Sequence, residues 1–159
     1  MRPKKYPLEP LARVRRAQLD ASARALADAV RAREEAEQKR LAAEQEARER
    51  AARSAVAREA ESEALRQGEL SVADLQRQGA WEVRVQAEER EAGRVLRDLT
   101  ADVTTRRSCE AGAKAGVTSG EAELKVVLEH RSQWQDAKER ADEAAEEEVA
   151  AEAWRPRSG

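Results

Sequence analysis

The side chains that could carry chemistry are few and isolated in this sequence. His130 is the only histidine and Cys109 is the only cysteine. A structural zinc site uses four closely spaced ligands, so these two residues do not predict a metal centre. A nucleophilic cysteine needs a neighbouring base, and none is expected beside Cys109. We therefore expect no catalytic residue, no metal and no cofactor.

Residues 112–120 contain three glycines, a lysine and two hydroxyl side chains, as in phosphate-binding loops. Such a loop requires the order G-x-x-x-x-G-K-[ST] after a strand, and this segment has neither feature. Each glycine inside a helix costs about 1 kcal/mol relative to alanine. The segment therefore predicts a break or hinge in a helix, after which Thr118 and Glu121 could cap a new one.

The composition favours long helices over a thick core. Charged residues make up 39% of the chain and aromatic residues 3%, and the net charge is −2. Alanine, glutamate and arginine dominate and are strong helix formers. The carboxylates have no expected pocket in which to act as acid or base. A net charge near zero gives no case for nucleic-acid binding, and no apolar run predicts stable membrane insertion. With one cysteine the chain cannot form an intrachain disulfide, so we expect a cytoplasmic protein.

Residues 67–71 predict a sharp turn. Gly68 is the first glycine or proline after Pro10, and it suits the end of a helix because it adopts positive φ readily. Ser71 and Asp74 can cap the next helix reciprocally. We expect an all-α fold in which two long helices form an antiparallel coiled-coil hairpin, rather than one continuous helix. This single domain covers residues 1–159, with arm one about 10–66, the turn 67–71, and arm two about 72–153.

Apolar residues of the first arm recur every eleven positions at Leu8, Leu19, Val30, Leu41 and Ala52. This period favours a nearly straight or slightly right-handed seam. Charged residues dominate between positions 33 and 66. Pairs such as Glu44–Arg48 and Glu46–Arg50 each stabilise a helix by roughly 0.3 kcal/mol.

Folding the chain about residues 69–70 places residues opposite each other when their numbers add to about 139. Large residues then meet: Leu41 faces Leu96 and Leu99, Val30 faces Cys109, and Trp134 faces Tyr6 and Leu8. This register predicts that the Cys109 thiol is packed and that Trp81 and Trp134 belong to the core. It leaves Trp154 exposed.

The two ends carry opposite charge. Residues 1–18 contain six basic residues and one acid, and residues 139–154 contain seven acids and one arginine. On the predicted register the second arm outruns the first. Arg13 and Arg16 then face Val126 and Glu123 and are only partly compensated. The basic start is thus the strongly one-signed surface of the first arm, and it is the candidate contact with a partner.

The opening Tyr6-Pro7-Leu8-Glu9-Pro10-Leu11-Ala12-Arg13-Val14-Arg15 resembles the aromatic-x-Leu-x-x-Leu-x-x-Val-Arg start of the FliJ/YscO-type stalk proteins of type III secretion. The similarity continues in Glu35-Ala36-Glu37, in the turn from Gly68 to Leu75 followed by Trp81, and in the stretch from Arg131 to Trp134. The resemblance implies an antiparallel two-helix coiled coil, similar to the γ subunit of rotary ATP synthases, that stands in a hexameric ATPase.

The resemblance also implies a non-catalytic role. Such a stalk links the hexameric type III secretion ATPase to the export-gate protein and assists the handover of export chaperones and substrates at the inner membrane. We expect ATPase contacts at Tyr6, Leu8, Leu11, Arg13 and Arg16, and an export-gate contact near the turn at Leu70, Leu75 and Trp81. The alternatives are an unrelated coiled-coil scaffold and a charged single-helix spacer.

Overall fold

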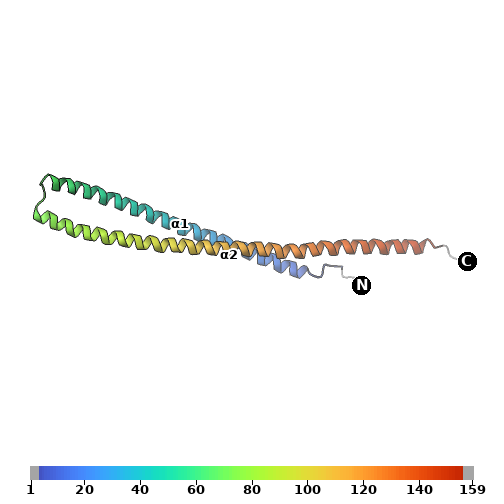
Figure 1. Ribbon diagram of the computed structural model, residues 1–159. Coiled ribbons are helices and arrows are strands. Elements are labelled where there is room, and N and C mark those ends of the chain that lie inside the picture. Colours follow the sequence, from blue (N-terminus) through green and yellow to red (C-terminus); the bar gives the residue numbers. More distant parts are fainter. Residues whose placement is uncertain (1–3, 156–159) are drawn as a thin grey trace. The chain divides into compact units, whose positions relative to one another are not determined.

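The computed structural model describes residues 4–155 of the chain and shows two helices that contact each other (Figure 1). Helix α1 covers Glu9–Arg66 and helix α2 covers Val72–Ala153. Within residues 4–155 there is no strand, so the predicted all-α fold with two long helices is confirmed. Arg2, which belongs to the predicted basic start, and residues 156–159 lie outside the described residues.

Helix α1 is stabilised along its exposed surface by ion pairs four residues apart. The guanidinium of Arg50 lies 2.6 Å from Glu46, and that of Arg48 lies 3.5 Å from Glu44. Both pairs were expected from the sequence. Because each stabilises the helix by only a few tenths of a kcal/mol, the helix depends mainly on the intrinsic preference of its many alanine, glutamate and arginine residues.

The end of α1 is closed by a glycine in the left-handed conformation. Gly68 has a φ of 69°. Its amide donates to the carbonyl of Leu65 at 3.1 Å, and the amide of Glu69 donates to the carbonyl of Ala64 at 3.0 Å. These two bonds form a Schellman motif, which satisfies carbonyls that the helix end leaves unpaired. The predicted stop at Gly68 is confirmed.

The start of α2 has the predicted reciprocal cap. The amide of Asp74 donates to Ser71 Oγ at 3.2 Å, and the amide of Ser71 donates to the Asp74 carboxylate at 2.9 Å. The Ser71 hydroxyl also donates to that carboxylate at 2.7 Å. These bonds, the side-chain bond first, lower the pKa of Asp74 because they favour its ionised form.

The predicted break at residues 112–120 is wrong, because α2 passes through the whole segment as continuous helix. Thr118 does not cap a new helix: its hydroxyl donates to the carbonyl of Lys114 at 3.1 Å, one turn back. Gly120 lies against α1, where an added Cβ would be 3.3 Å from Leu19 Cδ1. The glycine penalty of about 1 kcal/mol is therefore too small to end a helix that its neighbours and α1 support.

The chain divides into two compact units. The first comprises Met1–Ala27 and Gly112–Gly159, and the second comprises Asp28–Ala111, so each combines a segment of α1 with a segment of α2. In the first unit Arg15 pairs with Glu123, and in the second Arg33 pairs with Glu110 and Arg58 with Glu82. As residue numbers rise along α1 they fall along α2, and the pairs lie close to the predicted register.

The less exposed side chains recur at alternating steps of three and four residues, which is a seven-residue period. In the first unit they include Ala12, Arg15, Leu19, Ser22 and Leu26 of α1, with Ala113, Val117, Gly120, Leu124, Val127, Arg131 and Trp134 of α2. In the second unit they include Ala29, Arg33, Ala36, Arg40, Ala43 and Ala47 of α1, with Leu96, Leu99, Val103 and Glu110 of α2.

This spacing corrects the predicted eleven-residue repeat. Leu41 is 53% exposed and Ala52 is also exposed, so the repeat does not describe the contact face. The predicted burial of Cys109 is wrong as well, because the thiol is exposed and the adjacent Glu110 turns toward α1 instead. Many positions that face the other helix hold alanine or ion-paired residues. The spacing of large apolar residues in the sequence therefore does not identify them.

Candidate functional site

Tyr6 anchors the start of the chain against α2. Its side chain is buried with Ala12 and Val127, and Trp134 packs against this cluster. The Tyr6 and Trp134 rings have centroids 5.6 Å apart, which confirms their predicted pairing. The Tyr6 hydroxyl lies 2.7 Å from Nδ1 of His130 and donates to the carbonyl of Val127 at 3.4 Å. Tyr6, a predicted partner contact, thus holds the two helices together with its ring turned inward.

Two ion pairs hold the neighbouring turns. Arg131 lies 3.3 Å from Glu9, and Arg15 lies 2.7 Å from Glu123. The predicted register placed Arg16 opposite Glu123. The observed partner of Glu123 is Arg15, one residue earlier. The reason is geometric: Arg15 lies on the side of α1 that faces α2, together with Ala12 and Leu19, whereas Arg16 is exposed.

The other predicted contact residues remain exposed but do not form one surface. Leu8 is 39% exposed and Leu11 is 37% exposed, and Arg13 and Arg16 are also exposed. Because successive residues turn by about 100° around a helix, Leu11 and the two arginines lie on different flanks of α1. Val14, 50% exposed, extends the apolar flank. Sequence reasoning missed Val14, although its three-residue spacing from Leu11 is a visible signal.

An open cleft of about 930 Å³ lies at this end of the first unit. Its lining combines the aromatic residues of the Tyr6 cluster with both kinds of charge: Lys4, Lys5, Tyr6, Pro7, Glu9, Pro10, Arg13, Arg131, Trp134, Gln135, Lys138, Glu139 and Asp142. The ammonium of Lys138 lies 5.9 Å from the centre of the Trp134 ring, a favourable cation–π distance. We refer to this cleft and the exposed Leu8, Leu11, Arg13 and Arg16 as the open end.

The turn carries a second group of exposed apolar side chains. Leu65 is 56% exposed, Val72 is 72% exposed and Leu75 is 40% exposed. Of the other predicted turn contacts, Leu70 and Trp81 are half-buried. Leu75 is thus the most accessible of the three residues expected to contact the export gate, and Val72 and Leu65 add to the apolar surface beside it.

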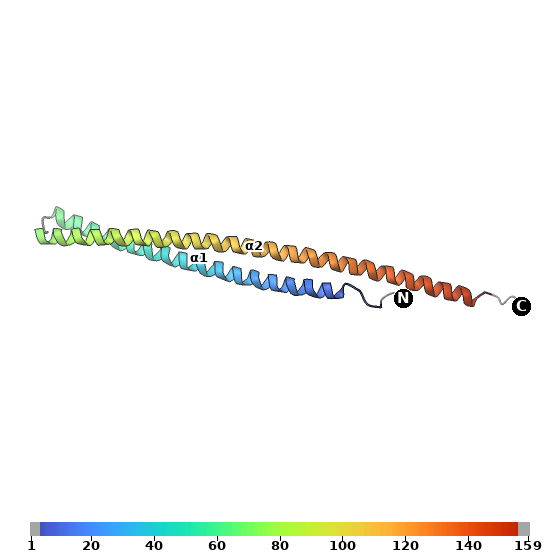
Figure 2. The same cartoon turned by 90° about the horizontal axis from the view of Figure 1, so that it is seen from below.

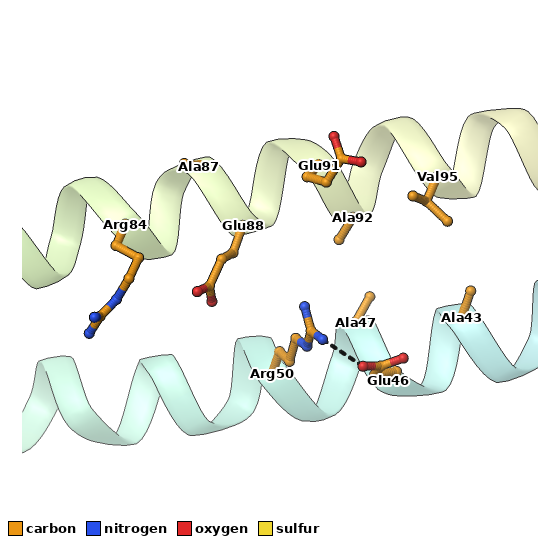
Figure 3. A pocket seen from close by; sticks show the side chains of 10 residues that line it. All are labelled: Ala43, Glu46, Ala47, Arg50, Arg84, Ala87, Glu88, Glu91, Ala92 and Val95. Carbon is orange, nitrogen blue, oxygen red and sulfur yellow. Dashed lines mark hydrogen bonds and ion pairs between the residues drawn. The ribbon is translucent and has the colours of Figure 1, made fainter.

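A groove of about 440 Å³ lies between the helices of the second unit (Figure 3). Ala47 and Ala92 point toward each other across it, and the side chains are too short to fill the space. Its rim is charged, with Arg50 paired to Glu46 at 2.6 Å. The groove is a consequence of an alanine seam, and it offers a surface for packing rather than groups for catalysis.

Cross-helix ion pairs hold the second unit together. Arg33 is hydrogen-bonded to Glu110 at 2.5 Å, which raises the pKa of its guanidinium. Glu37 accepts from Arg107 at 2.8 Å, and this bond lowers the Glu37 pKa. Arg58 contacts both oxygens of Glu82, at 2.8 and 3.1 Å, and lowers the pKa of that carboxyl in turn. Exposure differs among these pairs: the Arg33 and Glu110 side chains are 23% and 12% exposed, whereas those of Arg58 and Glu82 are 39% and 32% exposed. The pairs fix which residues of the two helices meet, and solvent screens the more exposed one.

Among residues 4–155, no three side chains of histidine, cysteine, aspartate or glutamate lie together as metal ligands. None of the described helices has the length and apolar character needed to span a membrane. Comparisons with family models, with curated proteins and with solved structures gave no match to this chain.

Proposed function

We propose that this chain is a non-catalytic stalk of a type III secretion or flagellar export apparatus. In this proposal its helices form one antiparallel coiled-coil hairpin domain in the cytoplasm, at the inner membrane. The hairpin links a hexameric secretion ATPase to the export-gate protein and assists the handover of chaperones and substrates. The opening residues from Tyr6 to Arg15, which resemble the start of FliJ/YscO-type stalks, are the basis of the assignment.

The open end is the structural observation that carries the proposal. Tyr6 is fixed between Val127, His130 and Trp134, so the first turn of α1 is presented on a rigid support. Leu8 and Leu11 then offer apolar contact, and Arg13 and Arg16 offer positive charge. The exposed leucines on one flank and the exposed arginines on another suit a protein partner whose acidic, partly apolar surface contacts both flanks.

The turn supplies the opposite contact in this proposal. Its Schellman motif and the Ser71–Asp74 cap give it a defined backbone, and Leu75 and Val72 are exposed beside them. We assign the export-gate contact to this apolar surface. Trp81, which is half-buried, would support it from within α2.

Binding to the ATPase can be tested by double charge reversal. Arg13→Glu with Arg16→Glu should lower capture of the purified hexamer by roughly tenfold or more, because rim charges that attract become repulsive. The matched control is Arg48→Glu with Arg53→Glu, which reverses two exposed arginines of the second unit. Helix content is checked by circular dichroism. If both double variants bind the hexamer as the wild type does, the open end is not the contact.

The groove between the helices supports a second candidate function. An unrelated coiled-coil scaffold would use the alanine-lined space around Ala47 and Ala92 to pack a further helix. Ala47→Leu would fill that space and should abolish scaffold assembly without affecting ATPase capture. The two candidates therefore respond to different substitutions.

A further inference from the structure

Helix α2 continues well past the beginning of α1, as both views show (Figures 1 and 2). We call residues 142–153 the acidic extension. Every side chain in it is exposed. It contains six carboxylates and no basic residue: Asp142, Glu143, Glu146, Glu147, Glu148 and Glu152. The described residues of the first unit, 4–27 and 112–155, thus leave these side chains exposed to solvent.

The charges of the acidic extension oppose its own helix. Asp142 and Glu146 are four residues apart, as are Glu143 and Glu147, and like charges at this spacing destabilise a helix. Carboxylates near a helix C-terminus also interact unfavourably with the helix dipole, and the last turn of α2 holds no basic residue. A cationic neighbour would relieve both effects.

The lysines of the same chain reach only the first part of the extension. Lys4 and Lys5 line the open-end cleft with Glu139 and Asp142, but the cleft does not extend to the later carboxylates. The acids from Glu143 to Glu152 therefore face solvent.

A matching basic surface lies on α1 of the same unit. Arg13, Arg16 and Arg24 are exposed and lie within about 80° of one another around the helix, with Asp20 as the one acid between them. They span 12 residues, or roughly 18 Å at 1.5 Å per residue. The 12-residue extension is roughly 18 Å long by the same rise. No ion pair joins these three arginines to another side chain in the part of the chain that the structure describes. We call them the basic face.

We propose that two copies of this chain associate end to end, with the acidic extension of each lying along the basic face of the other. The contact is complementary in sign and equal in length. Because each copy supplies both surfaces, a two-fold axis closes the assembly after two chains. The association does not require the ATPase contact proposed above, but it occupies Arg13 and Arg16, so the dimer and the ATPase would compete for the open end.

The test is the mass of the full chain in solution by light scattering and sedimentation equilibrium. At 0.1 M salt we expect a concentration-dependent dimer. At 1 M salt, where the screening length falls from about 10 Å to about 3 Å, we expect a monomer. The measurement should extend to about 0.2 mM protein, because small interfaces associate weakly. A monomer at both salt concentrations over this range would overturn the proposal. So would a dimer that is insensitive to salt.

Paired charge reversals identify the surfaces. An acid-reversed variant carries Glu143→Lys, Glu146→Lys and Glu147→Lys, and a base-reversed variant carries Arg13→Glu, Arg16→Glu and Arg24→Glu. Each alone should weaken dimerisation by roughly tenfold or more. Mixed together they should form a heterodimer, because both contacts are restored with opposite sign.

The matched control reverses three exposed acids near the turn, Glu59, Glu63 and Glu69, and should dimerise as the wild type does. Failure of the mixed reversed variants to associate would refute the assignment, provided that circular dichroism shows both to be helical. Full dimerisation of either reversed variant alone would also refute it. Loss of ATPase capture in the base-reversed variant without any change in mass would leave the proposed function standing and remove the dimer.

Discussion

Replacement of Gly116 by alanine is expected to stabilise the protein. Gly116 lies inside α2, its φ is not positive, and a Cβ built on it meets no atom within 4 Å. Alanine therefore gains its full helix preference over glycine, about 1 kcal/mol. The gain depends on the segment 112–120 being helix, so the substitution tests the continuity of α2 directly.

Gly68 provides the control of opposite sign. It also has no atom within 4 Å of a built Cβ, so space does not distinguish the two sites. The backbone conformation distinguishes them: Gly68 has a φ of 69°, and alanine in this left-handed region costs about 1–2 kcal/mol. Gly68→Ala should therefore destabilise the protein. At Gly120, where the Cβ would lie 3.3 Å from Leu19 Cδ1, alanine should gain less than at Gly116.

The measurement is urea denaturation followed by circular dichroism at 222 nm, with stabilities compared only where the denaturant dependence is unchanged. We expect Gly116→Ala to unfold at higher urea and Gly68→Ala at lower urea than the wild type. If Gly116→Ala is neutral or destabilising while Gly68→Ala behaves as predicted, α2 is interrupted at 112–120 and the description of that segment is wrong.

Three further substitutions test individual contacts. Ser71→Ala removes the cap of α2 and should lower the free energy of unfolding by about 1 kcal/mol in urea denaturation; an unchanged midpoint would contradict the capping role. Tyr6→Phe keeps the ring against Trp134 but loses the hydroxyl contacts with His130 and Val127, so a loss of about 1 kcal/mol is expected by the same assay, and a loss several times larger would show that the ring itself had moved. Glu82 has a pKa lowered by Arg58, so its carboxylate stabilises the fold above the ordinary value of 4.5, and this contribution is lost as the pH falls through the lowered pKa. Glu82→Gln should therefore be less stable than the wild type at pH 7, and the difference should disappear as the pH falls through the lowered pKa of Glu82; a difference that persists at still lower pH would exclude the ionic cause.

The turn and the helices were predictable because they depend on local chemistry. Gly68 and the Ser71–Asp74 pair act on backbone groups within a few residues, and such signals are legible in sequence. The pairing of Tyr6 with Trp134 followed from the position of the turn. Once the turn is known, the length of each helix fixes which residues meet.

The predictions that were wrong concern residues that face the other helix and are small or charged. Arg33 and Glu110 look like solvated residues in the sequence, yet they pair across the helices, and Cys109 beside them is exposed. Gly120 looks like a helix breaker, but it lies where Leu19 approaches α2. At the open end, Lys138 and Asp142 join the cleft from α2, and only the register of the two helices reveals that. These features depend on contacts between the two helices, which the helix propensity of individual residues does not encode.

The proposed coupling role is tested most directly by the rate of ATP hydrolysis of a purified type III secretion ATPase titrated with this chain. The proposal predicts that the rate rises and saturates at one chain per hexamer, and that Arg13→Glu with Arg16→Glu shifts the titration to higher concentration. A rate that is unchanged at every ratio, with the hexamer shown to be assembled, would contradict the assignment as a stalk of that ATPase.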